Sequence, residues 1–205
     1  MNYFVTAIGT DSGKTLVSAI LTEALQADYW KPIQSGKESR DVETVAKLIN
    51  NNHSFCYEET YLFSKPISPH AAAKADGQTI ELNKIVLPKN GGNHIIIEGA
   101  GGVLVPLNET DFVIDIAAKF EAEIILVSNT YLGSINHTLL TVQELKRRKL
   151  KVKGIIFNGI ENKETESIIL KNSGYKYLLR ILPENNISQE IVTQYAIKLF
   201  ENWDE

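Results

Sequence analysis

Cysteine is almost absent from this sequence. The chain has 205 residues and one cysteine, Cys56. A lone cysteine excludes a disulfide within the chain and any Cys-x-x-Cys metal or redox motif. We therefore expect a protein that works in a reducing compartment.

Long apolar runs and a surplus of basic charge are also missing. No segment approaches the roughly 18 to 20 consecutive apolar residues of a membrane span, and the first residues read as a strand without a basic signal segment or cleavage site. The net charge is −4, and nucleic-acid binding requires a basic face. The one basic cluster, residues 146–153, is typical of a helix C-terminus, where the macrodipole favours cations. We expect a cytoplasmic protein that binds neither nucleic acid nor membrane.

The sequence does have the length and composition of one ordinary globular domain, with 43% hydrophobic and 22% charged residues. We therefore expect a single domain over residues 1–205. Short β-branched runs alternate with amphipathic stretches. The runs predict strands at residues 3–8, 94–100, 123–129, 152–158 and 177–182. The amphipathic stretches predict helices at residues 14–26, 41–50, 82–86, 113–120, 135–149, 163–173 and 189–200. This alternation indicates an α/β fold, a mostly parallel sheet with helices on both faces.

Residues 51–77 have the weakest periodicity of the chain, and Pro66 and Pro69 interrupt them. We interpret this segment as a long excursion between elements of the domain. Long loops in compact domains are usually functional. Around Ser68 and His70, the segment either covers a bound substrate or simply packs on the fold, and the sequence leaves both open.

Residues 2–15, NYFVTAIGTDSGKT, have the layout of a phosphate-binding loop between a strand and a helix. In such a loop the backbone N–H groups of Ser12, Gly13 and Lys14 hold phosphate oxygens. The Lys14 ammonium reaches the β- and γ-phosphates, and the Thr15 hydroxyl binds magnesium. The strict motif has a glycine where this chain has Ile8, so the start of the loop is unusual.

A glutamate ends three consecutive isoleucines in HIIIEGAGG, residues 94–102. Glu98 at this strand tip has the form of a Walker B carboxylate, which holds magnesium opposite the threonine of the phosphate-binding loop. The glycines that follow allow the backbone to approach a ligand closely. An exposed glutamate before an ordinary glycine turn is the alternative.

The segment KPIQSG, residues 31–36, begins with one candidate site residue and is followed by another. Lys31 precedes Pro32 at the end of a short strand, which suits a group held rigidly near a reacting atom. A solvated surface lysine is the alternative. Asp41 opens a helical pattern, and it is either the N-cap of that helix or a second magnesium carboxylate.

Two later strands end in groups that suit a ligand. After residues 123–129 comes SNTYLGSINHTLLT, in which the helix N-terminus at residues 133–136 suits an anion such as a carboxylate. His137 is more simply a polar residue at a helix start than a catalytic base. Asn158 ends IIFNG, and its amide either pairs with an adenine edge or forms part of a turn.

In combination these motifs resemble the dethiobiotin synthetase family, and the resemblance runs from Tyr3 to the region of Asn185. The motifs that carry it are FVT followed by TDSGKT, KPIQSG, Asp41, SPH, IEGAGG, LGSINH and Asn158. The resemblance implies a P-loop nucleoside triphosphate hydrolase fold and a magnesium-dependent ligase of biotin biosynthesis. The substrates it implies are ATP, carbon dioxide or bicarbonate, and 7,8-diaminopelargonic acid (7,8-diaminononanoate). The products are dethiobiotin, ADP and phosphate.

The reaction that the resemblance implies passes through a carbamate of the diamine, which attacks the γ-phosphate, and a mixed anhydride, from which the second amine displaces phosphate. An anion approaching a polyanion requires concentrated positive charge, which Lys14, Lys31 and magnesium would supply.

The resemblance also implies a role for each matching residue. Lys31 and Lys14 are the catalytic lysines, and Ser35 contacts the diamine or its carbamate. Thr15, Asp41 and Glu98 hold magnesium. The residues around ATP are Asp11, Ser12, Gly13, Lys14, Thr15, Leu16, Asp41, Glu98, Gly99, Ala100, Gly101, Asn158, Gly159, Pro183, Glu184 and Asn185. The family is homodimeric, and its LGxINH loop reaches the substrate of the neighbouring subunit. The residues of that loop here are Gly133, Ser134, Ile135 and Asn136.

The chain departs from the family pattern at three positions. Ala7 stands where a glycine commonly begins the loop, and Tyr131 stands where lysine or asparagine is common. Gly159 replaces a frequently polar residue, so that only its backbone could contact the base.

Two other classes of protein share parts of the pattern. A ParA/MinD-like ATP switch carries an additional lysine five residues before the loop lysine, where this chain has Gly9, and the acidic C-terminal end lacks a basic amphipathic helix. An amidoligase of the cobyrinic acid type would share the loop and Glu98, but not KPIQSG together with LGSINH.

Overall fold

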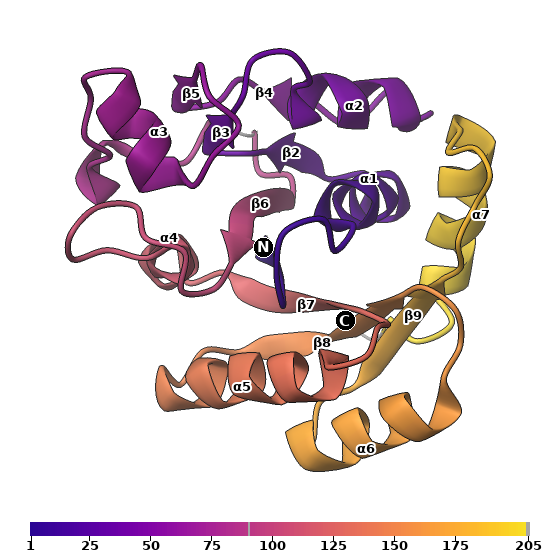
Figure 1. Ribbon diagram of the computed structural model, residues 1–205. Coiled ribbons are helices and arrows are strands. Elements are labelled where there is room, and N and C mark those ends of the chain that lie inside the picture. Colours follow the sequence, from indigo (N-terminus) through magenta and orange to yellow (C-terminus); the bar gives the residue numbers. More distant parts are fainter. Residues whose placement is uncertain (90, 204–205) are drawn as a thin grey trace.

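A parallel sheet forms the centre of the computed structural model, which describes residues 1–89 and 91–203. Its seven strands are β1 Asn2–Ala7, β2 Asp28–Trp30, β4 Cys56–Tyr57, β6 Ile95–Gly102, β7 Glu123–Asn129, β8 Val152–Asn158 and β9 Tyr177–Ile181. Their spatial order is β4-β2-β6-β1-β7-β8-β9, and the pairings between neighbours are parallel. Two further strands, β3 Ile33–Ser35 and β5 Tyr61–Phe63, form a separate parallel pair. The sheet runs through the molecule from β4 to β9 (Figure 1).

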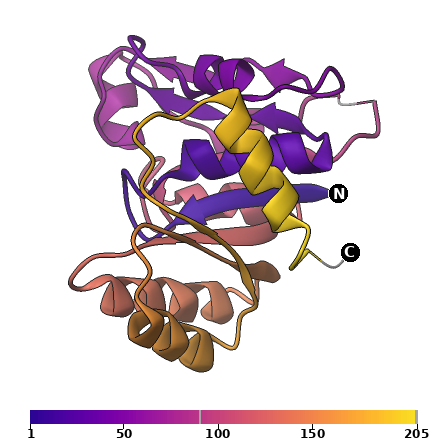
Figure 2. The same ribbon diagram turned by 90° about the vertical axis from the view of Figure 1, so that its right-hand side faces the viewer.

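Helices cover both faces of this sheet because side chains along each strand alternate between the faces. On one face the buried residues of α1 Lys14–Leu25, α2 Asp41–Leu48 and α7 Gln189–Leu199 pack on the sheet. On the other face lie α4 Val113–Lys119, α5 Ser134–Arg147 and α6 Lys163–Ser173. The alternation is visible in β1, where Phe4 lies in the core on the α4 side of the sheet and Val5 lies in the core on the α1 side, the α1 core. Figure 2 shows α1 and α7 on one side of the sheet and α5 and α6 on the other.

The remaining helix, α3 Pro69–Ala75, packs beside the β3–β5 pair. Two of its buried residues, Ala72 and Ala73, join the core that contains α4. No helix in the described ranges combines the length and the apolarity that crossing a membrane requires.

The structure confirms the expected fold class, and it corrects two details. Residues 51–77 are not an irregular excursion, because they contain β4, β5 and α3. The expected helix at residues 82–86 is wrong, since only a 3-10 turn, η1 Leu82–Lys84, forms there. Strands of two or three residues are too short for an alternating pattern to appear in the sequence, which explains the first error.

Candidate active site

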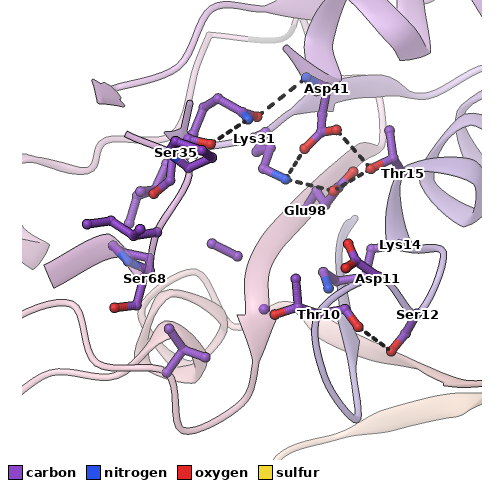
Figure 3. A pocket seen from close by; sticks show the side chains of 18 of the residues that line it. Thr10, Asp11, Ser12, Lys14, Thr15, Lys31, Ser35, Asp41, Ser68 and Glu98 are labelled. Atoms are coloured by element: carbon purple, nitrogen blue, oxygen red, sulfur yellow. Dashed lines mark hydrogen bonds and ion pairs between the residues drawn. The ribbon is translucent and has the colours of Figure 1, made fainter. Parts of the chain in front are cut away.

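A cavity of ≈ 690 Å³ lies at the carboxyl ends of β1, β2 and β6 (Figure 3). Ligands of open parallel sheets bind at this edge. Most of the cavity's walls come from the loop after β1 and the segment after β2. The lining residues are Thr10, Asp11, Ser12, Gly13, Lys14, Thr15, Lys31, Ile33, Gln34, Ser35, Asp41, Pro66, Ile67, Ser68, Pro69, Glu98, Ala100, Gly101 and Val105.

The loop between β1 and α1 turns into the helix at Gly13, whose φ of 91° lies in the left-handed region. A Cβ atom at this position would lie 2.3 Å from Nδ2 of Asn158. That same Nδ2 donates a hydrogen bond to the Ser12 carbonyl at 2.9 Å. Glycine is therefore required both by the backbone and by the packing of Asn158. The N–H groups of the first turn of α1 have no carbonyl partner within the helix, which suits them to an anion.

The structure shows why Ile8 can stand where the strict motif has its first glycine. Its backbone N–H donates to the Val127 carbonyl at 3.2 Å, which continues the pairing of β1 with β7 by one residue. Its side chain packs against the core on the α4 side of the sheet. The chain at this point still follows a strand, so a residue with an apolar side chain fits and the tight turn comes later.

Two carboxylates and a hydroxyl converge at one end of the cavity (Figure 3). The Thr15 hydroxyl oxygen lies 3.1 Å from Oδ1 of Asp41 and 3.1 Å from Oε1 of Glu98. The Lys31 ammonium donates to Oε1 of Glu98 at 2.9 Å and also forms an ion pair with Asp41. Residues far apart in the sequence therefore meet at a single charged cluster.

The register of the sheet brings Lys31 and Glu98 together. Tyr29 of β2 lies opposite Ile96 of β6, so the next residues on the same face of the two strands are Lys31 and Glu98. Lys31 is 7% exposed, so its interpretation as a solvated surface lysine was wrong. The N-cap of α2 is Arg40 and Asp41 is the first helical residue, so the N-cap interpretation of Asp41 was wrong as well.

The donor atoms of this cluster fit magnesium. The ligand atoms that Thr15, Asp41 and Glu98 offer are all oxygens, and Mg²⁺ in nucleotide sites is bound by one or two carboxylates with phosphates and waters as the other ligands. The described residues contain no group of three or more His, Cys, Asp or Glu side chains that could hold a metal ion. Thr15, Asp41 and Glu98 would thus hold magnesium as part of a set completed by the nucleotide.

Burial and neighbouring charges act differently on the two lysines of the cavity. Burial lowers the pKa of Lys14 to about 8, although Glu98 counteracts part of this effect. Burial alone would also lower the pKa of Lys31, but the carboxylates of Glu98 and Asp41 raise it above its ordinary value. The raised pKa keeps Lys31 charged at neutral pH, whereas Lys14 donates to the Gly9 carbonyl at 3.0 Å and loses its charge at a lower pH than an ordinary lysine.

Sequence reasoning missed two residues of this site. The Tyr29 hydroxyl donates to Oε2 of Glu98 at 2.9 Å. Burial, and to a lesser extent the charge of Glu98, raises the pKa of Tyr29 well above its usual value, so the phenol keeps its proton. Gln34 accepts from the backbone N–H of Asp41 at 3.4 Å and donates to the Ser35 carbonyl at 3.2 Å. The strand period could have revealed Tyr29, because residues two apart in a strand face the same side.

Ser35 and residues 66–69 form the wall of the cavity opposite the phosphate-binding loop (Figure 3). The Ser35 hydroxyl is buried and has no hydrogen-bond partner among the described residues. Part of the segment around Ser68 therefore lines the cavity, while Ala72 and Ala73 of α3 pack in the core.

Several predicted site residues do not line this cavity. Leu16 packs on the α1 core, and Gly99 faces Phe4 and Val113 in the other core. Asn158 contacts the loop, and Gly159 donates its N–H to the Ile181 carbonyl at 2.8 Å. Residues 183–185 follow β9, where Glu184 accepts from the Tyr195 hydroxyl. Residues 133–136 form the start of α5, with all but Ser134 exposed. The ligand roles of these residues stay predictions.

Comparison with known proteins adds the family to this geometry. Residues 1–190 match the family model described as an AAA domain. The ATP-dependent dethiobiotin synthetase BioD of Cytophaga hutchinsonii is 62% identical over 99% of this chain and 98% of its own length. The chain belongs to the dethiobiotin synthetase family. A second dethiobiotin synthetase, from Christiangramia forsetii, is 46% identical over 96% of this chain and 95% of its own.

Solved structures show that this dethiobiotin synthetase family member shares its fold with P-loop ATPases. The septum site-determining protein MinD of Pyrococcus horikoshii superposes with a TM-score of 0.58 at 18% identity, covering 98% of this chain and 95% of its own. A ParA family ATPase of Chlorobium tepidum gives 0.57 at 14% identity, covering 98% and 92%. At such identities the likeness concerns the fold alone.

Proposed function

We propose that this chain is an ATP-dependent dethiobiotin synthetase, a ligase that forms C–N bonds in biotin biosynthesis. Its reaction would carboxylate 7,8-diaminononanoate with carbon dioxide and close the ureido ring, giving dethiobiotin, ADP and phosphate. The observation that carries the proposal is the convergence of Lys31, Asp41, Glu98 and Thr15 beside the phosphate-binding loop in one cavity. The 62% identity to a dethiobiotin synthetase over nearly the whole chain supports it.

ATP would bind with its phosphates on the N-terminus of α1. Residues 11–16 surround that helix start, and the backbone of residues 99–101 follows Glu98 into the same region. Lys14 would leave the Gly9 carbonyl and pair with the β- and γ-phosphates. Asn158, Gly159 and residues 183–185 would form the adenine side, since they lie at or after the carboxyl ends of β8 and β9 and Asn158 bonds this loop.

Magnesium held by Thr15, Asp41 and Glu98 would supply charge neutralisation at the phosphates. Lys31 would hold the carbamate, because its raised pKa keeps it cationic and its ammonium lies at the cavity wall. One substrate amine adds to carbon dioxide and loses a proton to give the carbamate. A carbamate oxygen then attacks the γ-phosphorus and ADP leaves. The second amine would finally attack the carbonyl carbon and lose a proton, and phosphate would leave as the ring closes.

The wall opposite the loop suits the rest of the diamine. The hydroxyl of Ser35 is free to bond an amine or carbamate, while Ile33, Ile67 and Val105 offer apolar surface to an aliphatic chain. The cavity of ≈ 690 Å³ lies within the usual size range of sites for small ligands.

The chain would act as one domain and as a homodimer. Leu132 is fully exposed, and Tyr131 and Ile135 beside it are also exposed at the start of α5. In a dimer these side chains would be covered, and the amides of residues 133–136 would bind the substrate carboxylate of the partner subunit. A cytoplasmic location would give the enzyme the ATP that it consumes.

Incubation of the purified protein with 7,8-diaminononanoate, bicarbonate and MgATP tests the function directly. ADP and dethiobiotin should form in equal amounts, and leaving out the diamine should stop ADP release. ADP release that ignores the diamine, or the absence of a ring-closed product, would overturn the proposal. Replacing the diamine with other carboxylates distinguishes this reaction from that of an amidoligase, because ADP release should depend on the diamine alone.

A further inference from the structure

The phenol of Tyr29 lies beneath the charged cluster and outside the cavity. Tyr29 is fully buried in the α1 core, and its hydroxyl donates to Oε2 of Glu98 at 2.9 Å. Glu98 itself is 1% exposed. The phenol therefore touches the site through one atom of one carboxylate.

The two oxygens of Glu98 have separate partners. Oε1 faces Thr15 and Lys31 at the cavity, at 3.1 and 2.9 Å. Oε2 accepts a hydrogen bond from the Tyr29 hydroxyl, and Tyr29 does not line the cavity. A carboxylate with both oxygens free could rotate and present either one or both, whereas a donor on Oε2 fixes the plane and leaves Oε1 for the cavity.

We propose that Tyr29 is a positioning residue that fixes the Glu98 carboxylate, so that Oε1 alone is presented to the magnesium of the nucleotide complex. The inference rests on the proposed function, because it deepens the role of Glu98 there. Partners of metal-binding carboxylates typically change metal affinity by 10- to 100-fold when they are removed.

A neighbouring tyrosine provides a matched control. The Tyr57 hydroxyl donates to Oδ2 of Asp28 at 3.2 Å, which is also a phenol-to-carboxylate hydrogen bond, and the Lys89 carbonyl is its second acceptor at 3.0 Å. Tyr57 lies on β4, next to β2, and Asp28 begins β2, away from the cavity. Tyr57→Phe therefore removes the same kind of bond from the same part of the sheet without touching the site.

The experiment compares Tyr29→Phe and Tyr57→Phe with the unchanged protein. Binding of a nonhydrolysable ATP analogue is measured by calorimetry over a series of free Mg²⁺ concentrations, and again in excess EDTA. For Tyr29→Phe we expect the Mg²⁺ concentration at half-maximal binding to rise about 10-fold or more, with unchanged metal-free binding. Tyr57→Phe should match the unchanged protein in both measurements.

A Tyr29→Phe protein with unaltered Mg²⁺ dependence would overturn the inference, even if its melting temperature fell. Glu98→Gln in both backgrounds makes the test specific, since Tyr29→Phe should have no further effect on Mg²⁺ dependence once the carboxylate is gone. If Glu98→Gln itself leaves the Mg²⁺ dependence unchanged, the proposed metal site fails, and that result is distinct from a failure of Tyr29 alone.

A second measurement does not require Tyr29→Phe to fold. Biosynthetic replacement of all eight tyrosines by 3-fluorotyrosine makes each phenol a more acidic donor while keeping the chain's shape. Fluorination should change the Mg²⁺ concentration at half-maximal binding, and it should do so by the same factor in the unchanged protein and in Tyr57→Phe. Unshifted dependence in the fluorinated protein would contradict the role of the Tyr29 hydroxyl.

Discussion

At the scale of single residues, two buried lysines of the same cavity differ in their partners and in their pKa values. Lys31 has two carboxylates as partners, and Lys14 has a backbone carbonyl. Burial disfavours the charged form of both, but only Lys31 receives enough opposite charge to raise its pKa. The two residues therefore suit different proposed tasks: Lys31 would act as a fixed cation, and Lys14 would become fully charged when phosphate binds.

Replacing Lys31 should affect chemistry more than nucleotide binding. We expect Lys31→Ala to bind the nonhydrolysable ATP analogue with Mg²⁺ nearly as the unchanged protein does, and to lose about 10²- to 10³-fold in kcat, because its charge acts on the developing anion. Single-turnover formation of dethiobiotin measures this loss. Lys47→Ala, at an exposed position of α2, is the control. Normal turnover by Lys31→Ala would show that Lys31 only neutralises Asp41 and Glu98.

The lowered pKa of Lys14 predicts how nucleotide affinity depends on pH. The ammonium form of Lys14 would bind phosphate. Its pKa of about 8 is below that of an ordinary lysine, so the free protein loses the ammonium form as the pH rises through 8. The association constant for MgATP analogue should be flat below pH 7 and fall by at most about 10-fold per pH unit above pH 8. Calorimetry at pH 7, 8 and 9 tests this. Lys14→Gln should bind weakly with little change between these values, and constant affinity of the unchanged protein up to pH 9 would contradict the prediction.

At the scale of elements, the phosphate-binding loop is held by its neighbours on both sides. Ile8 extends the pairing of β1 with β7, and Asn158 at the end of β8 bonds the Ser12 carbonyl. The loop therefore depends on β8, whose Asn158 lies 146 residues after Ser12 in the sequence.

Two glycines of this loop should differ sharply in their tolerance of a side chain. Gly13→Ala puts a Cβ 2.3 Å from Nδ2 of Asn158 at a φ of 91°, so we expect a loss of about 1–3 kcal/mol in the free energy of unfolding and a weakened nucleotide site. At Gly9 a Cβ would meet nothing closer than the Ser12 hydroxyl oxygen at 4.0 Å. Gly9→Ala should accordingly keep its stability. Urea denaturation measures the free energy of unfolding of both variants. Equal values would contradict the requirement for glycine at position 13.

Short elements were the ones that sequence patterns could not predict. The helices with a clear apolar stripe, such as α1, α5 and α7, appeared close to their expected positions. β4 and β5 have two and three residues, and their pairing with β2 and β3 is fixed by partners distant in the chain. No local period records such a pairing, so residues 51–77 looked irregular.

At the scale of the whole molecule, the sheet divides the core into two and leaves the start of α5 uncovered. α5 and α7 lie on opposite faces. Each carries exposed apolar side chains, and Leu132, just before α5, is more exposed than Ile197 of α7. This difference allows the proposed dimer interface to be tested against a matched position on the other face.

We expect Leu132→Asp to dissociate the dimer, because a charge at a covered apolar position is left without a partner. Ile197→Asp on α7 should leave the dimer intact. Sedimentation equilibrium of the three proteins measures the oligomeric state, and the assay with 7,8-diaminononanoate should show a higher KM for Leu132→Asp. A monomeric unchanged protein, or a dimer that survives Leu132→Asp, would contradict the proposed interface.

The sequence by itself determined the fold class, and it predicted the phosphate-binding loop and a candidate metal carboxylate at Glu98. These features depend on local patterns: apolar runs, a helical period, and Gly-Lys-Thr between them. Only the tertiary structure decided that Lys31 is buried, that Asp41 is a partner of Lys31 rather than an N-cap, and that Tyr29 bonds Glu98. Each of these facts depends on the register of β2 against β6 and on the packing of α1 and α2, which bring together atoms that no short stretch of sequence contains.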